Sequence, residues 1–220
     1  TGKLLWSTWA IPEPKEGEVS SYSLTMAARV AKGKVFIGNA GAEFPPFRGY
    51  VSAYDVNTGK QLWKFYTTPG DPSKGFENKA MEAAARTWGG DFFKNGGGGA
   101  VWDGFAYDPE ANLVYVGTGN AEPWVQKFRG AQNVDNLYTC SIIAVDLTTG
   151  QYKWHFQTTP NDNWDFDSVQ QLMILDLTIK GRQRKVIMQA AKNGFFYVLD
   201  RATGEFLSAR NYVQIGRAHV

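Results

Sequence analysis

One short pattern recurs along the chain of 220 residues: a Thr-Gly pair with a tryptophan four positions after the glycine. Its copies are Thr1-Gly2 with Trp6, Thr58-Gly59 with Trp63, Thr149-Gly150 with Trp154, and Thr203-Gly204, where Ser208 replaces the tryptophan. An apolar segment ending in Asp precedes each of the last three copies. Glycine permits the positive φ of a tight turn, and Asp and Thr side chains bond nearby backbone groups. The repeat therefore predicts a series of β-hairpins.

The spacing of the repeat indicates how the hairpins are grouped. Successive glycines of the Thr-Gly pairs are 57, 91 and 54 residues apart. A period in the fifties is typical of four-stranded propeller blades, and an insertion accounts for the longer interval. The Ala-rich stretch Glu77–Arg86 predicts a helix within that insertion. Short strands are expected at Lys34–Ile37, Tyr50–Tyr54, Leu62–Tyr66, Phe105–Tyr107, Leu113–Val116, Ile142–Val145, Tyr152–Phe156, Leu172–Leu177, Val186–Gln189 and Phe195–Leu199.

The predicted fold is all-β, a fragment of about three to four blades of a β-propeller. An open stack of blades exposes sheet edges, so we expect these blades to belong to a larger closed ring. A smaller β-sandwich is the alternative, which the repeated turns disfavour. Residues 1–214 are expected to form this partial propeller domain. Residues 215–220 resemble the in-frame translation of a sequencing adapter, and we expect this tail to be foreign to the protein. An ordinary polar tail is the alternative.

The composition excludes several classes of protein. The chain has 23 Lys and Arg against 21 Asp and Glu, a formal charge of +2 that gives no electrostatic footprint for nucleic acid. No apolar run approaches the roughly 18–20 residues of a membrane span. A single cysteine, Cys140, excludes an internal disulfide framework, a Cys-rich zinc site and a covalent haem motif within this segment.

The residues suited to chemistry lie outside the repeat, in segments between predicted strands. Residues 38–43 contain a carboxylate after a glycine-containing loop. Residues 96–103 contain four consecutive glycines and then an indole. Residues 117–124 set an amide on a tight turn, and residues 161–168 combine carboxylates with two aromatic side chains. Each segment alone is a weak signal, because glycine turns and solvated Asp-rich turns are common.

Together with residues 48–55 and 192–201, these four segments resemble the pyrroloquinoline quinone (PQQ)-dependent alcohol dehydrogenases, the quinohaemoprotein branch above all. The resemblance extends from about residue 1 to residue 213. It implies an eight-bladed propeller that holds PQQ near its axis beside a hard cation. It also implies periplasmic oxidation of a primary alcohol to an aldehyde by hydride transfer to PQQ, with a cytochrome c as electron acceptor and no nucleic-acid partner.

The resemblance assigns the site residues one by one. Glu43, Asn120 and Asp165 would ligate the cation, whose preference for carboxylate and amide oxygens agrees with this set. Asp165 would also be the general base, and the cation would act as Lewis acid. The remaining assignments concern the quinone: Trp102 would form the floor under its ring, Lys192 would bond its oxygens, and Gly41 and Ala42 would offer backbone N–H groups to its carboxylate.

Two positions depart from the common pattern of the family. Ala100 stands where many relatives have Thr, so one hydroxyl contact to the cofactor is expected to be missing. Asp167, two positions after Asp165, resembles the Asp-aromatic-Asp pattern of the lanthanide-using branch. A trivalent ion needs a further anionic ligand to offset its desolvation. We therefore expect Asp167 to join the metal ligands and to favour a light lanthanide over calcium.

Two other functions stay open at this point: a noncatalytic propeller that scaffolds envelope-protein assembly, and a PQQ-dependent dehydrogenase of sugars or polyols. The scaffold has no need for Glu43, Asn120, Asp165 and Lys192 together. The enzyme instead requires the oxygens of Glu43, Asn120, Asp165 and Asp167 to converge on one ion-sized space. The segment by itself, with so few blades, is expected to be inactive.

Overall fold

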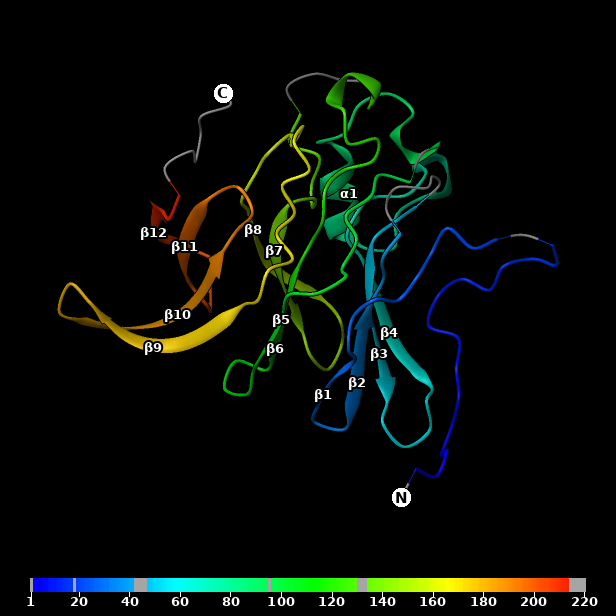
Figure 1. The fold of residues 1–220 in the computed structure, drawn as a ribbon, viewed down its shortest axis with the longest axis horizontal. Coiled ribbons are helices and arrows are strands. Elements are labelled where there is room, and N and C mark those ends of the chain that lie inside the picture. The colour runs from blue at the N-terminus through cyan, green and yellow to red at the C-terminus, as the bar shows by residue number, and fades with distance from the viewer. Residues whose placement is uncertain (1, 18, 42–46, 95, 130–133, 214–220) are drawn as a thin grey trace.

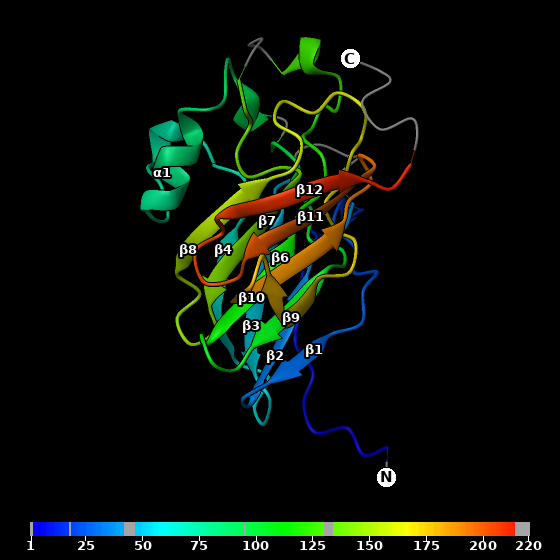
Figure 2. The same ribbon diagram turned by 90° about the vertical axis from the view of Figure 1, so that its left-hand side faces the viewer.

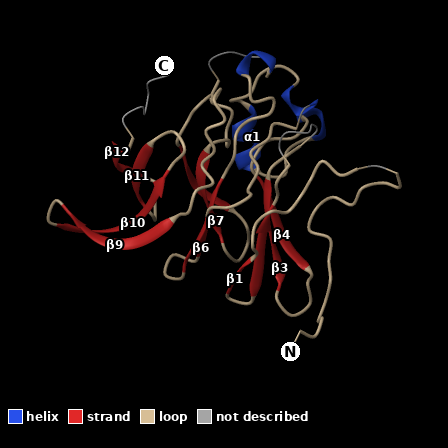
Figure 3. Ribbon diagram, viewed as in Figure 1, coloured by secondary structure: helices blue, strands red, loops and turns tan. Residues whose placement is uncertain are grey.

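The computed structural model describes residues 2–17, 19–41, 47–94, 96–129 and 134–213. These residues form three antiparallel sheets of four strands each (Figures 1 and 3). Neighbouring strands in each sheet follow one another in the chain, as in the blades of a propeller. The first sheet consists of β1 (Arg29–Ala31), β2 (Lys34–Gly38), β3 (Tyr50–Asp55) and β4 (Gln61–Tyr66). The middle sheet consists of β5 (Phe105–Asp108), β6 (Leu113–Gly117), β7 (Ser141–Asp146) and β8 (Tyr152–Gln157). The third sheet consists of β9 (Met173–Ile179), β10 (Arg182–Ala190), β11 (Phe195–Asp200) and β12 (Phe206–Asn211).

The three sheets stack face to face, with the strands of one lying behind those of the next in Figure 2. The middle sheet is buried on both faces, which explains the continuous apolar run of β7. Ile143 and Val145 pack with residues of the first sheet, whereas Ile142 and Ala144 pack with residues of the third. A strand buried on both faces needs apolar residues at every position rather than at alternate ones.

The Thr-Gly repeat proves to be the link between successive blades. The indole Nε1 of Trp6 donates to the Val56 carbonyl (2.9 Å), that of Trp63 to Leu147 (3.1 Å), and that of Trp154 to Arg201 (3.2 Å). Each acceptor directly follows the Asp of the next turn, and each indole also covers the glycine of that turn. A Cβ atom added to Gly59, Gly150 or Gly204 would lie 2.4–2.6 Å from an indole carbon. The glycine therefore serves both the turn and the packing between blades.

Alanine at Gly150 should separate these two roles. Gly150→Ala places a methyl group against Trp63, and we expect the overpacking to lower the free energy of unfolding by about 1–3 kcal/mol beyond the backbone strain. Gly181→Ala is the matched control, because Gly181 has a similar φ (+75° against +71°) and no atom within 4 Å of an added Cβ. Chemical unfolding of both variants tests the prediction, and equal losses would contradict it.

The fold agrees with the sequence prediction except at its edges. The predicted helix is present as α1 (Lys79–Ala85), begun by Asn78, whose Oδ1 accepts the Met81 N–H (3.0 Å). Strands β1 and β12 were not predicted, and the described residues form three complete sheets with no partial fourth. The predicted tail, residues 215–220, lies outside the described residues. None of the helices in the described ranges has the length and apolarity needed to cross a membrane.

Candidate functional site

The fold brings the chemistry-bearing segments together because they occupy equivalent places in the three sheets. Within each sheet the first strand begins beside the end of the second, as the pairs Phe105–Val116 and Met173–Met188 show. Segments that precede the first strand therefore meet segments that follow the second at one end of the stack. This end also carries α1 and the long loops (Figure 1). The segments before first strands are 20–25, 100–103 and 165–168; those after second strands are 39–41, 118–122 and 191–192.

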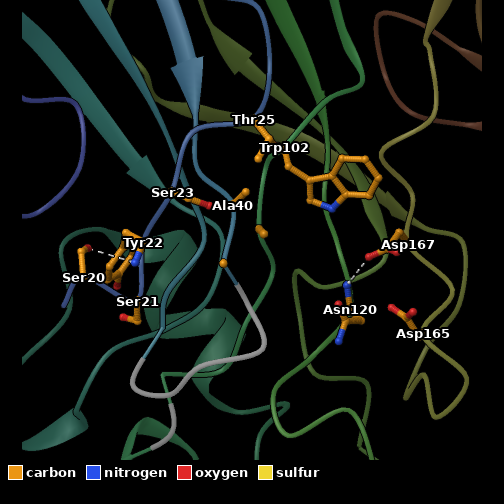
Figure 4. A pocket seen from close by; sticks show the side chains of 12 residues that line it. Ser20, Ser21, Tyr22, Ser23, Thr25, Ala40, Trp102, Asn120, Asp165 and Asp167 are labelled. Atoms are coloured by element: carbon orange, nitrogen blue, oxygen red, sulfur yellow. Dashed lines mark hydrogen bonds between the residues drawn. The ribbon is translucent and has the colours of Figure 1, made fainter.

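A pocket of about 420 Å³ lies at this end of the sheets (Figure 4). Its volume lies within the range of about 300–1,000 Å³ found for small-molecule sites. Among the predicted site residues, Gly41, Trp102, Asn120, Asp165 and Asp167 line it. The rest of the lining comes from Ser20, Ser21, Tyr22, Ser23, Thr25, Ala40 and Ala100.

Two carboxylates and one ammonium group form the charged centre of the site. The Nζ atom of Lys192 lies 3.1 Å from Oδ2 of Asp165 and 3.2 Å from Oδ2 of Asp167. The Asp167 side chain is 8% exposed and the Asp165 side chain 52%, so one carboxylate is enclosed while the other faces the open pocket. The two carboxylates thus lie on either side of a positively charged group, the Lys192 ammonium.

The pKa values reflect this enclosure. Burial and the neighbouring Asp165 carboxylate raise the pKa of Asp167 to about 6, against the opposing effects of Lys192 and of the Asn120 N–H. Burial alone would lower the pKa of Lys192, but its hydrogen bonds to Asp165 and Asp167 outweigh this effect and raise it. Ionising Asp167 therefore costs free energy that an added cation would recover.

The loop after β6 is bonded directly to Asp167. The backbone N–H of Asn120 donates to Oδ1 of Asp167 (3.0 Å), and Gly119 lies so close that an added Cβ would be 2.9 Å from the same oxygen. The Nδ2 of Asn120 donates to the Ala121 carbonyl (3.1 Å) and to Oε1 of Glu122 (3.3 Å). With its nitrogen bound in this way, the amide has its Oδ1 atom to offer to a ligand.

Asp165 has a backbone conformation that few non-glycine residues adopt, with φ at +61°. The neighbouring Asp162 holds the loop in this shape: its buried carboxylate accepts the N–H groups of Trp164 and Phe166, both at 3.2 Å. Burial raises the pKa of Asp162, while these hydrogen bonds act to lower it. Strain of this kind persists where the surrounding structure enforces it, often at a functional site.

The hydroxyl-rich segment Ser20–Thr25 is the part of the pocket that sequence reasoning missed. It is fixed by two backbone hydrogen bonds between Ser23 and Ala40, at 2.8 and 2.9 Å. The signal was available: the segment precedes the first strand of its sheet, the same place that Trp102 and Asp165 occupy in theirs. Its position before a first strand is therefore the signal that could have indicated Ser23 and Thr25 as candidates.

Only some of the predicted metal ligands lie in the part of the chain that the structure describes. Asn120, Asp165 and Asp167 line one pocket, whereas Glu43 and Ala42 lie outside the described residues. Among the residues that are described, no three His, Cys, Asp or Glu side chains form a metal-binding group. Two carboxylates and an amide oxygen are nevertheless a donor set suited to a hard cation, and the enclosed, charged Asp167 fits that use. The residues present therefore fit both the cation and, beside Trp102, a flat cofactor.

Three sheets of four antiparallel strands are the blades of a β-propeller, and acidic, amide and lysine side chains gather at one end of them. The chain belongs to the PQQ-dependent glucose/ethanol/alcohol dehydrogenase β-propeller domain family, whose model matches residues 8–215. This membership establishes the all-β propeller fold that the repeat predicted, and it implies PQQ as the cofactor.

Individual relatives are identical to this chain at about half of the aligned positions. The chain is 54% identical to the quinohemoprotein alcohol dehydrogenase ADH-IIG of Pseudomonas putida over 214 residues, which cover 97% of the chain and 29% of that protein. The solved structure of ADHIIG superposes with a TM-score of 0.91. That of the quinohemoprotein alcohol dehydrogenase of Comamonas testosteroni does so with a TM-score of 0.86 at 53% identity, covering 90% of the chain and 30% of its own.

A more distant solved relative is a europium-containing methanol dehydrogenase. It is 37% identical, with a TM-score of 0.77 over 87% of this chain and 34% of its own. The chain thus spans about 30% of the length of the relatives that it matches.

Proposed function

We propose that this chain is the part of a PQQ-dependent alcohol dehydrogenase that carries the cation ligands and the general base, and that the enzyme oxidises primary alcohols to aldehydes. When bound, PQQ supplies the hydride acceptor and the cation supplies a Lewis acid. A small alcohol is the substrate, a cytochrome c takes the electrons, and the periplasm is the expected location. The relatives named as quinohemoprotein alcohol dehydrogenases support this assignment.

The single observation that carries the proposal is the grouping of Asn120, Asp165 and Asp167 around one pocket that Trp102 also lines. Asp165 is its half-exposed carboxylate, so a substrate hydroxyl can reach it and lose its proton there. Asp167, enclosed and bonded through Oδ1 to the Asn120 N–H, would be a further anionic ligand of the cation. Lys192 would donate to quinone oxygens, and Gly41 and Ala42 would bind the cofactor through backbone N–H groups.

The competing proposals differ from this one in what they require. A scaffold for envelope-protein assembly has no use for a pocket lined by two carboxylates and an amide. A sugar or polyol dehydrogenase would keep the same charged centre and differ in the walls around it. Reduction of an artificial electron-accepting dye by the enzyme from the complete gene, loaded with PQQ and tested on a panel of alcohols and sugars, separates the three. Dye reduction with primary alcohols is the expected result, and none with any substrate would overturn the proposal.

Asp167 should decide which ion supports activity. We expect a light lanthanide to support higher turnover than Ca²⁺, and Asp167→Ala, which removes one anionic ligand, to abolish the lanthanide-supported turnover selectively. Asp167→Asn is the matched variant, because it removes the charge yet keeps an oxygen that can accept the Asn120 N–H. Turnover of the reconstituted enzyme with La³⁺ and with Ca²⁺ measures the effect. Equal or better activity of the unaltered enzyme with Ca²⁺ alone would contradict the lanthanide preference.

A further inference from the structure

Arg129 is a buried arginine whose position the proposed chemistry does not explain. It does not line the pocket, and only 2% of its surface is exposed. A guanidinium group carries five N–H donors, and burial of any unpaired one would be costly. Burial of an arginine is therefore maintained only where the surroundings bond it fully.

The guanidinium of Arg129 bonds three separate segments of the chain. Nη1 donates to the carbonyls of Pro123 (2.9 Å) and Trp124 (2.7 Å), in the loop that begins with Asn120. Nε donates to Oδ1 of Asn136 (3.1 Å). Nη2 donates to Oδ1 of Asn161 (3.3 Å) and to the carbonyl of Asp162 (2.7 Å), at the start of the loop that carries Asp165.

The contact with Asp162 leads directly to the base. Asp162 accepts the N–H groups on both sides of Asp165, those of Trp164 and Phe166, and so supports the positive φ of Asp165. Arg129 fixes the backbone of Asp162 and, through Pro123 and Trp124, the loop of Asn120. One side chain thus sets the separation between the two loops that carry the predicted ligands.

We infer that Arg129 is a positioning residue that fixes the loop of Asn120 relative to the loop of Asp165 and Asp167, and thereby sets the affinity of the site for its cation. The inference rests on the proposed function for the identity of the ligand. Arg129 acts through these two loops, since it does not itself line the pocket. Groups that orient metal ligands from outside the coordination sphere typically change metal affinity by roughly 10–100-fold when they are removed.

The test measures cation binding and loop order separately in the enzyme from the complete gene. Tb³⁺ is titrated into the metal-free, PQQ-loaded enzyme and followed by its luminescence. We expect Arg129→Met to raise the Kd for Tb³⁺ by roughly 10–100-fold. Arg129→Lys, which keeps the charge but cannot span three segments, should recover part of the affinity. Hydrogen exchange of the Trp164 and Phe166 amides, measured without any ion, should be faster in both variants.

Arg201 provides the control for a merely structural effect. It is also buried and bonded to three carboxylates, those of Asp108, Glu110 and Asp176, but it lies at the hairpin end of the strands, opposite the pocket. Arg201→Met should lower the melting temperature and leave the Kd for Tb³⁺ unchanged. An unchanged Kd or unchanged exchange in folded Arg129→Met would overturn the inference. Absence of Tb³⁺ binding in the unaltered enzyme would instead overturn the proposed function, and the exchange data would still decide the role of Arg129.

Discussion

Asp165→Asn should lower kcat for alcohol oxidation by about 10²–10⁴-fold, the range typical for loss of a positioned general base. The amide keeps the size of the carboxylate and can still place one oxygen toward a cation, but it cannot accept the proton of the alcohol. Since the Asp165 side chain is half exposed in the pocket, the substitution should fold without difficulty. Steady-state kinetics with a primary alcohol, together with Tb³⁺ binding to confirm an occupied site, measures the effect.

Asp103→Asn is the control that distinguishes loss of the proton-accepting group from loss of one negative charge near the site. Asp103 follows Trp102 and is bonded to Gln171 (3.0 Å), outside the pocket lining. Its substitution removes one negative charge close to the site without touching the base, and kcat should stay near that of the unaltered enzyme. A loss in Asp103→Asn as large as that in Asp165→Asn would mean that overall charge, and not a specific base, controls the rate.

Lys192→Met should weaken PQQ binding by about 10–100-fold. A hydrogen bond from an ammonium to a charged or strongly polar acceptor contributes about 1.5–3 kcal/mol, which corresponds to that change in Kd. The substitution also leaves Asp165 and Asp167 facing each other without their shared ammonium, which adds repulsion to the anionic site. Titration of the cofactor-free enzyme with PQQ, followed by quenching of tryptophan fluorescence, gives the Kd directly.

Lys185→Met serves as the comparison for this loss of a positive charge. Lys185 is an exposed lysine paired with Glu110 at the hairpin end of the middle and third sheets. Its removal changes the net charge equally but should leave the Kd for PQQ unaltered. If both lysine variants bind PQQ as tightly as the unaltered enzyme, Lys192 does not contact the quinone.

The blade architecture could be predicted because its information is local. The turn requires glycine and the indole of the preceding blade requires the space that glycine leaves, so Gly59 and Trp63 mark the sheets in the sequence itself. The two missed strands lack such signals. β1 has only three residues, and β12 has Ser208 in place of the tryptophan that identifies the other last strands.

The site was predictable only in part, because its support is not local. The motifs that carry Trp102, Asn120 and Asp165 are each a weak signal, and only their combination indicated a family. The bonds that fix them could not: Asp167 meets the N–H of Asn120 across 47 residues of chain, and Arg129 meets Asp162 across 33. Burial of Arg129 is a tertiary property that no spacing in the sequence expresses.

In each hydrogen bond that links successive blades, the donor lies earlier in the chain than the acceptor. Each indole precedes its acceptor in the chain, by 50 residues for Trp6, 84 for Trp63 and 47 for Trp154. Ribosomal synthesis proceeds from the N-terminus, so every donor emerges before the turn that receives it. A newly made blade thus leaves its indole unbonded until the following Thr-Gly turn has been synthesised. Each blade can therefore be joined to the one before it as soon as its own Thr-Gly turn is available.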